Sequence, residues 1–293
     1  MQNLRLTLIL CLNLVILYCS SENISDQKIR IMTFNIRVNV QSDSLNAWPY
    51  RKEIAASMIR FHHADIIGIQ EALLNQVEDL AERLPNYYWF GVGRDDGDEK
   101  GEFMAIFYLK KRFKVINNYT FWLSENPEIP GKGWDAACNR IVTWGKFKDS
   151  ETGKIFYHFN THFDHIGEMA MEESAKLLLK YITSIAGNSD VIVTGDFNST
   201  PNSITYKILT QDLEGESELK LIDTKMVSKH PHHGPNGTFT GFKLLNLIGN
   251  DQPIDYIFIT SRIKVLNHGT LSDTFDGLFS SDHMPVLAEI IIE

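Results

Sequence analysis

Four apolar segments of this chain each adjoin side chains that can bind a metal ion or transfer a proton. Three of them end in Asn35, in Gln70-Glu71 and in Asp196-Phe197-Asn198, and the fourth, Val286–Ile292, directly follows the Asp282-His283 region. Short runs rich in β-branched and apolar residues are typical of buried strands. One polar strand end is easily a coincidence. Four of them predict a fold of buried strands whose ends supply one polar site.

Helical and strand-like segments alternate along the chain. Apolar residues recur at helical spacing in residues 48–63, where Pro49 suits the first turn, and again in residues 168–185. These segments lead into the strands that end at Glu71 and at residues 190–194. The other expected elements are a helix at 73–84 and strands at 103–109, 141–147, 155–162, 254–259 and 286–292. Repeated helix–strand units, with strands of antiparallel character between them, predict an α/β protein with two packed sheets in one domain.

Three longer segments show no such periodicity. They are residues 95–102, 124–139 and 229–239. Loops of this length often form the rims of functional sites, although a surface insertion explains each of them equally well when taken singly.

The first 21 residues differ from the rest of the chain. Arg5 precedes a run of apolar residues that ends near Leu17, and small residues follow. This pattern is typical of a secretory signal peptide, and the run is short for a membrane span of roughly 20 apolar residues. We therefore expect residues 1–21 to be removed, the mature chain to lack a transmembrane span, and the protein to be secreted or periplasmic. An uncleaved anchor is one alternative, and a lipid anchor at Cys19 is another that the bulky Tyr18 disfavours.

Charge and cysteine content limit the partners of the chain. Its net charge is −9, and its longest basic run is Lys110-Lys111-Arg112. Because duplex DNA is held largely through Lys and Arg contacts to phosphates, we do not expect tight non-specific duplex binding, although a nuclease with a local basic groove stays open. Without residues 1–21, Cys138 stands alone and cannot form an internal disulfide. We expect a monomer held together by its hydrophobic core.

Oxygen-bearing side chains dominate the candidate metal ligands. Asn35 ends a strand, Glu71 follows a buried strand, and Asp282 lies in a loop. Carboxylate and amide oxygens, completed by water, suit Mg²⁺ better than zinc, with Mn²⁺ or Ca²⁺ as alternatives. Taken singly, Asn35 could be a turn residue and Glu71 an acid at the start of a helix.

Two further polar patterns indicate acid–base and phosphate chemistry. Asp196 and Asn198 would point to one face if their strand continued, where they could orient a water molecule beside a phosphate oxygen. The alternative is an Asx turn into the segment that follows. Asn160, His162 and Asp164 also alternate along one strand, and three polar groups on one face favour a site over a single structural histidine.

Asp255 lies inside an apolar segment, and a buried carboxylate needs a partner. We expect that partner to be His283, because an Asp–His pair fixes the histidine tautomer and stabilises the imidazolium during proton transfer.

In this order along the chain, these residues resemble the endonuclease/exonuclease/phosphatase superfamily, which includes the DNase I-like nucleases. The resemblance runs over residues 28–293 as one domain and is nearest to an exported, bacterial-type subgroup. It implies a four-layered α/β sandwich, in which two packed mixed β-sheets are flanked by helices. The tyrosine that repair nucleases place near the phosphate has no counterpart in this sequence.

The resemblance also implies a role for each residue. Metal binding would fall to Asn35, Glu71 and Asp282, and the cofactor would be Mg²⁺. The catalytic set would be His162, Asp196, Asn198, Asp255 and His283, with Glu102 supporting His162. Arg140 and Asn198 would bind the phosphate-ester substrate, although a surface salt bridge is an alternative for Arg140.

The expected function is therefore that of an exported metal-dependent phosphoester hydrolase, a phosphodiesterase or phosphatase in which water attacks phosphorus. A secreted nuclease is the alternative within this class. A catalytically silent binding module on the same scaffold is a different interpretation, which the complete residue set disfavours.

Overall fold

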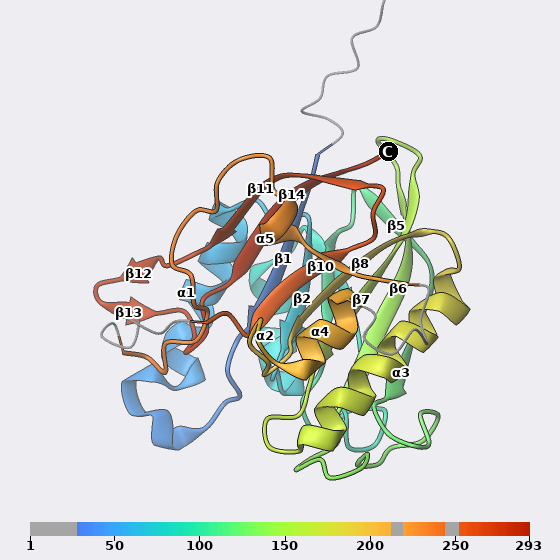
Figure 1. The fold of residues 1–293 in the computed structure, drawn as a ribbon. Helices are drawn as coiled ribbons and strands as arrows, with labels where there is room; N and C mark the ends of the chain where they lie inside the picture. The colour runs from blue at the N-terminus through green and yellow to red at the C-terminus, as the bar shows by residue number, and fades with distance from the viewer. Residues whose placement is uncertain (1–27, 212–218, 244–251) are drawn as a thin grey trace, which may run out of the picture.

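Two six-stranded sheets pack face to face in the computed structural model, which describes residues 28–211, 219–243 and 252–293 (Figure 1). The first sheet has the order β11-β14-β1-β2-β4-β3. Its strands are β1 (Ile29–Asn35), β2 (Ile66–Gln70), β3 (Tyr87–Phe90), β4 (Ile106–Leu109), β11 (Ile263–Thr270) and β14 (Val286–Ile292). The second sheet has the order β5-β6-β7-β8-β10-β9. Its strands are β5 (Phe113–Trp122), β6 (Ile141–Asp149), β7 (Ile155–His162), β8 (Asp190–Asp196), β9 (Ile222–Asp223) and β10 (Asp255–Ile259).

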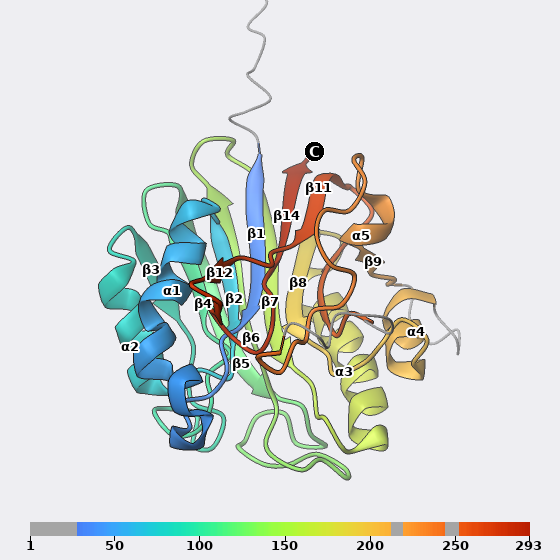
Figure 2. The same ribbon diagram turned by 90° about the vertical axis from the view of Figure 1, so that its left-hand side faces the viewer.

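Helices cover the outer face of each sheet. In Figure 2, α1 (Trp48–Phe61) and α2 (Leu74–Arg83) lie on one side of the sheets, and α3 (Glu168–Ala186) and α4 (Ile204–Gln211) lie on the other. The smaller elements are η1 (Gln41–Asn46), α5 (Thr224–Val227) and the hairpin of β12 (Thr274–Phe275) and β13 (Leu278–Phe279). The order helix, sheet, sheet, helix confirms the predicted four-layered α/β sandwich.

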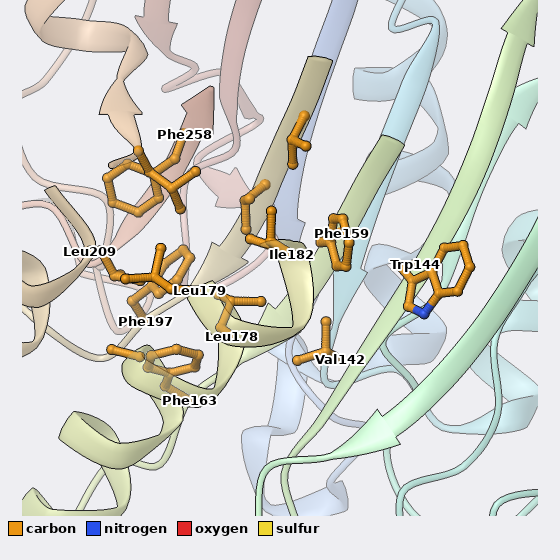
Figure 3. Packing of buried hydrophobic residues seen from close by; sticks show 14 of the residues in the cluster. Val142, Trp144, Phe159, Phe163, Leu178, Leu179, Ile182, Phe197, Leu209 and Phe258 are labelled. Atoms are coloured by element: carbon orange, nitrogen blue, oxygen red, sulfur yellow. The ribbon is translucent and has the colours of Figure 1, made fainter. Parts of the chain in front are cut away.

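The core follows the two-residue period of the strands. In β1, Met32 and Phe34 belong to the cluster under α1 and α2, whereas Ile29 and Ile31 belong to the cluster between the sheets. A third cluster lies between α3 and the second sheet (Figure 3); its members include Leu178, Leu179, Ile182, Phe159, Phe163, Phe197 and Phe258. Because most inner strands are covered on both faces, they read as almost continuous apolar runs.

Strand register brings the polar strand ends to one edge of the sandwich. β1 and β2 are parallel with Asn35 opposite Gln70, and β7 and β8 are parallel with His162 opposite Asp196. β10 runs antiparallel to β8 and begins at Asp255, opposite Asp196. Since β1 also contacts β8 and β10 across the sandwich, the ends of both sheets meet.

A polar layer between the sheets explains Asn160. Its amide donates to the carbonyls of Ile69 and Ala105 at 2.8 and 3.1 Å, and its oxygen accepts from Gln70. The sheets approach so closely that a Cβ on Gly68 would stand 2.4 Å from Asn160 Oδ1. The prediction that Asn160 shares a site with His162 is therefore wrong, because Asn160 is fully buried and joins the two sheets.

Several predicted boundaries differ from the structure. β4 begins at Ile106, three residues later than expected, because Phe103 instead forms isolated bridges to Ala72 and Gly93. The ten-residue strand β5 was not predicted, since exposed polar residues and a bulge after Val115 break its alternation. β11, interrupted by a similar bulge, and α4 were also not predicted.

The N-terminal prediction falls outside the described residues, because these begin at residue 28. Among the helices that the structure describes, none combines the length and apolar character needed to cross a membrane.

Candidate active site

The polar strand ends surround one cavity of about 490 Å³. Its lining combines side chains from both sheets and from the loops that leave them: Arg37, Val38, Glu71, Arg94, Glu102, Cys138, Arg140, His162, His165, Asp196, Asn198, Phe239, Ile254, Asp282 and His283. A cavity of this size suits a small ligand. Of the three alternating polar residues Asn160, His162 and Asp164, His162 lines it.

Asn35 links the two carboxylates at the centre of the cavity. Its Nδ2 donates to Glu71 Oε1 and to Asp196 Oδ2, both at 2.9 Å. Glu71 Oε2 also accepts from the backbone N–H of Val38 at 2.9 Å. Burial by itself would raise the pKa of Glu71, but His283 and these hydrogen bonds lower it, so Glu71 is ionised.

The donor set fits a hard divalent cation. A carboxylate oxygen of Glu71 and one of Asp196 lie within 4.8 Å of each other and of a ring nitrogen of His283. Asp282 lines the same cavity and lies 3.7 Å from Arg37 Nε. Several carboxylates converging on one buried point repel one another unless positive charge compensates them, and carboxylate oxygens are preferred ligands of Mg²⁺. Of the predicted ligands, Glu71 lies in this group. Asn35 contacts Glu71 through its Nδ2, whereas its Oδ1, the atom that could bind a metal, accepts from the backbone N–H of Arg37 at 3.0 Å.

Asp196 and Asn198 are joined by a turn, and the predicted continuation of the strand is wrong. β8 ends at Asp196, and Asn198 has a positive φ of 48°. The backbone N–H of Asn198 donates to Asp196 Oδ1 at 2.9 Å, which is the Asx turn given as the alternative. The turn aims the Asn198 amide at His162 Nε2, 3.0 Å away. Burial, reinforced by the charge of Asp255, raises the pKa of Asp196.

His283 is paired with Asp255 as predicted. Its Nδ1 donates to Asp255 Oδ2 at 2.9 Å, and its Nε2 lies 3.7 Å from Asp196 Oδ2. Burial disfavours the imidazolium, but the charges of Asp255 and Asp196 outweigh burial and raise the pKa of His283 to about 10. His283 therefore carries a positive charge at neutral pH. The ring of Phe239 packs against it, with the ring centroids 5.0 Å apart.

His162, in contrast to the positively charged His283, is neutral. Burial, followed by the positive charges of Arg140 and Arg94, lowers its pKa well below 6.5. Its Nε2 accepts from Asn198, and its buried Nδ1 has no partner among the described residues. Glu102, predicted to support His162, instead forms an ion pair with Arg94 at 2.6 Å. Burial raises the pKa of Glu102 to about 7.

Arg140 is buried and not part of a surface salt bridge, so that alternative is wrong. Its Nε donates to Asp164 Oδ2 at 3.3 Å, and its Nη2 donates to His165 Nδ1 at 2.9 Å. Asp164 also accepts from the backbone N–H groups of Ala137, Ile166 and Gly167. Although burial opposes it, these hydrogen bonds lower the pKa of Asp164. Asp164 therefore holds the loop that positions Arg140 and does not itself line the cavity.

Two arginines of the cavity, Arg37 and Arg94, were not predicted as site residues. Arg37 lies in the loop after β1 and Arg94 in the loop after β3. An isolated arginine in a loop carries no pattern that separates it from a surface residue. Arg37, Glu71 and Asn198 all have positive φ values, of 62°, 64° and 48°. Non-glycine residues rarely adopt this conformation, and such strain is concentrated at functional sites.

These features define a phosphoester hydrolase of the DNase I-like architecture. A sequence profile of the Endonuclease/Exonuclease/phosphatase family matches residues 32–283, and the chain belongs to that family.

Solved structures and curated proteins show the same relationship. An endonuclease/exonuclease/phosphatase from Bacteroides vulgatus is 42% identical, with a TM-score of 0.86 and coverage of 91% of this chain and 99% of that one. A mannosyl-6-phosphatase from Bacteroides thetaiotaomicron is 36% identical, with a TM-score of 0.83 and coverage of 90% of this chain and 100% of that one. A probable RNA exonuclease of Schizosaccharomyces pombe is 22% identical over 62% of this chain, and the match spans 38% of that relative's length.

Proposed function

We propose that this protein is an exported, Mg²⁺-dependent phosphatase that hydrolyses a phosphate monoester carried by a sugar. The observation that carries the catalytic part is the convergence of Glu71, Asp196, His162 and the Asp255–His283 pair on one cavity. The substrate class rests on the relationship to the mannosyl-6-phosphatase, which extends over the full length of that protein.

The residues divide the chemistry according to their charge states. Glu71, Asn35 and Asp282 would hold the cation, whose positive charge stabilises the charge that develops on the phosphate when it is bound. Asp196, with its raised pKa and buried carboxylate, is suited to accept a proton from the attacking water. His283, held as an imidazolium by Asp255, offers a proton and positive charge to the leaving oxygen. Neutral His162, positioned by Asn198, and Arg140 face the phosphate.

Export is a separate part of the proposal. It rests on the basic start and the apolar run of residues 1–21. The check is to recover the protein from outside the cytoplasm and to compare its N-terminal residue with the first residue of the encoded sequence.

A nuclease is the second candidate, because curated relatives include RNA exonucleases. The chain spans less than two fifths of the length of those two relatives, however, and its net charge is −9. The negative net charge favours a small phosphate ester over a nucleic acid strand.

One panel separates these proposals. The protein would be incubated with Mg²⁺ and mannose 6-phosphate, p-nitrophenyl phosphate, bis-p-nitrophenyl phosphate or single-stranded RNA. We expect phosphate release from the monoesters, and its loss in Asp196→Ala and His283→Ala. Faster cleavage of RNA than of any monoester would replace the phosphatase with the nuclease. No turnover of any substrate with any divalent ion would leave the silent binding module.

A further inference from the structure

Arg94 lines the catalytic cavity from the loop after β3, and Arg140 lines it as well. Its backbone is fixed on both sides: its N–H donates to the Glu102 carbonyl at 3.1 Å, and its carbonyl accepts from Trp122 Nε1 at 2.7 Å. The ion pair with Glu102 then holds the guanidinium, whose side chain is 13% exposed. A long side chain restrained in this way is positioned before any ligand arrives, which lowers the entropic cost of binding.

Both guanidinium groups keep one buried N–H without a partner. In the described part of the chain, no acceptor contacts Arg94 Nε or Arg140 Nη1. An unpaired buried donor is costly, and more so when it carries charge, because it has lost its water and gained no acceptor. Both side chains also line the cavity, where an anionic ligand would contact the reachable parts of the two guanidinium groups.

The positive potential of the two arginines extends to the reacting end of the cavity. After burial, the charges of Arg140 and Arg94 are the largest causes of the lowered pKa of His162. The same potential favours a ligand with more negative charge. A phosphate monoester carries between one and a half and two negative charges near neutral pH, whereas a diester carries one.

We propose that Arg94, acting with Arg140, is a specificity-determining residue that binds the terminal oxygens of a phosphate monoester and so favours monoesters over diesters. The inference rests on the proposed phosphatase function and extends it to the choice between the two ester classes. Glu102 is a positioning residue in this scheme, because it contacts Arg94 and holds its guanidinium.

The test compares Arg94→Gln and Arg94→Lys with the wild type. We would measure kcat/KM for p-nitrophenyl phosphate and for bis-p-nitrophenyl phosphate with Mg²⁺, and the inhibition constant of inorganic phosphate. A hydrogen bond to a charged group has a net free energy that corresponds to roughly tenfold to hundredfold in affinity. We therefore expect Arg94→Gln to lower kcat/KM for the monoester and to weaken phosphate inhibition by about that factor. The diester should change by less than about threefold. Arg94→Lys, which keeps the charge but loses the planar fork, should fall between.

Arg60→Gln is the matched control, since Arg60 lies on the exposed face of α1 and pairs with Glu53. Equal losses for both esters in Arg94→Gln, or no loss for either, would overturn the inference while leaving the phosphatase function intact. If the wild type hydrolyses neither ester, the proposed function fails. Calorimetric binding of inorganic phosphate with Mg²⁺ then decides the inference, which is overturned if Arg94→Gln binds as tightly as the wild type. A thermal melt of each variant shows whether it is folded, and Arg94→Lys replaces Arg94→Gln if the latter is not.

Discussion

Replacing Arg51 with methionine should weaken both the fold and the metal site, although Arg51 does not line the cavity. Arg51 is 1% exposed on α1. Its Nη1 donates to the carbonyls of Ile36 and Ser280 at 2.9 and 2.7 Å, and its Nε donates to the Asn46 carbonyl. Ile36 and Ser280 lie next to Asn35 and close to Asp282. One guanidinium therefore joins the two loops that carry predicted metal ligands.

The magnitude follows from these contacts. Two buried carbonyls and one partly buried carbonyl would lose their donor, and each buried loss costs about 1–3 kcal/mol. Part of the cost is recovered, because burial already disfavours the charge and lowers the pKa of Arg51 to about 10. We expect a net loss of about 3 kcal/mol in the free energy of unfolding. For a domain of this size, that lowers the Tm by roughly 6–12 °C.

The assay combines urea unfolding with a Mg²⁺ titration of the hydrolysis rate. In Arg51→Met we expect a lower urea midpoint and a higher Mg²⁺ concentration at half-maximal activity, since the two loops are no longer held together. Lys52→Met is the control, because Lys52 is the next residue of α1 and pairs with Asp79 at the surface at 2.7 Å. An exposed ion pair contributes about 0–1 kcal/mol. If Arg51→Met is as stable as Lys52→Met, or needs no more Mg²⁺ than the wild type, the reasoning is refuted.

Three further predictions concern the cavity itself. Asp255→Asn removes the negative charge that keeps His283 protonated, so the pKa of His283 should fall from about 10 and the alkaline limb of the kcat/KM profile should move to lower pH; an unchanged limb would exclude His283 as the group that titrates there. Dialysis against EDTA should abolish hydrolysis and added Mg²⁺ should restore it, with inductively coupled plasma measurement of residual metal; activity that persists without metal would remove Glu71 and Asn35 from their proposed role. Asn198 begins an Asn-Ser-Thr sequon, yet its amide contacts His162 and the Phe163 carbonyl, so active protein from a glycosylating host should carry no sugar there. Mass spectrometry that finds one on active protein would contradict that assignment.

Some contacts of the site could be predicted from the sequence, and others could not. His283 and Asp255 were expected to pair because an acid buried in an apolar strand needs a partner, and few candidates exist. The contact between Asp196 and Asn198 was expected from a continued strand, whereas an Asx turn produces it. Glu102 was assigned to His162 by resemblance, but the loop of residues 95–102 places its carboxylate against Arg94. Loop conformation has no periodicity that a sequence can reveal.

The amino-acid sequence by itself determined the layered α/β architecture and the residue types of the site. Local patterns suffice for this, since apolar runs and helical spacing specify which faces must be buried. The tertiary structure decided which polar residues meet. Asn160 and His162 lie two residues apart on one strand, yet Asn160 hydrogen-bonds across the two sheets and His162 lines the cavity. The unpaired N–H groups of Arg94 and Arg140 depend on contacts between residues far apart in the chain, which only the packed sheets and their loops establish.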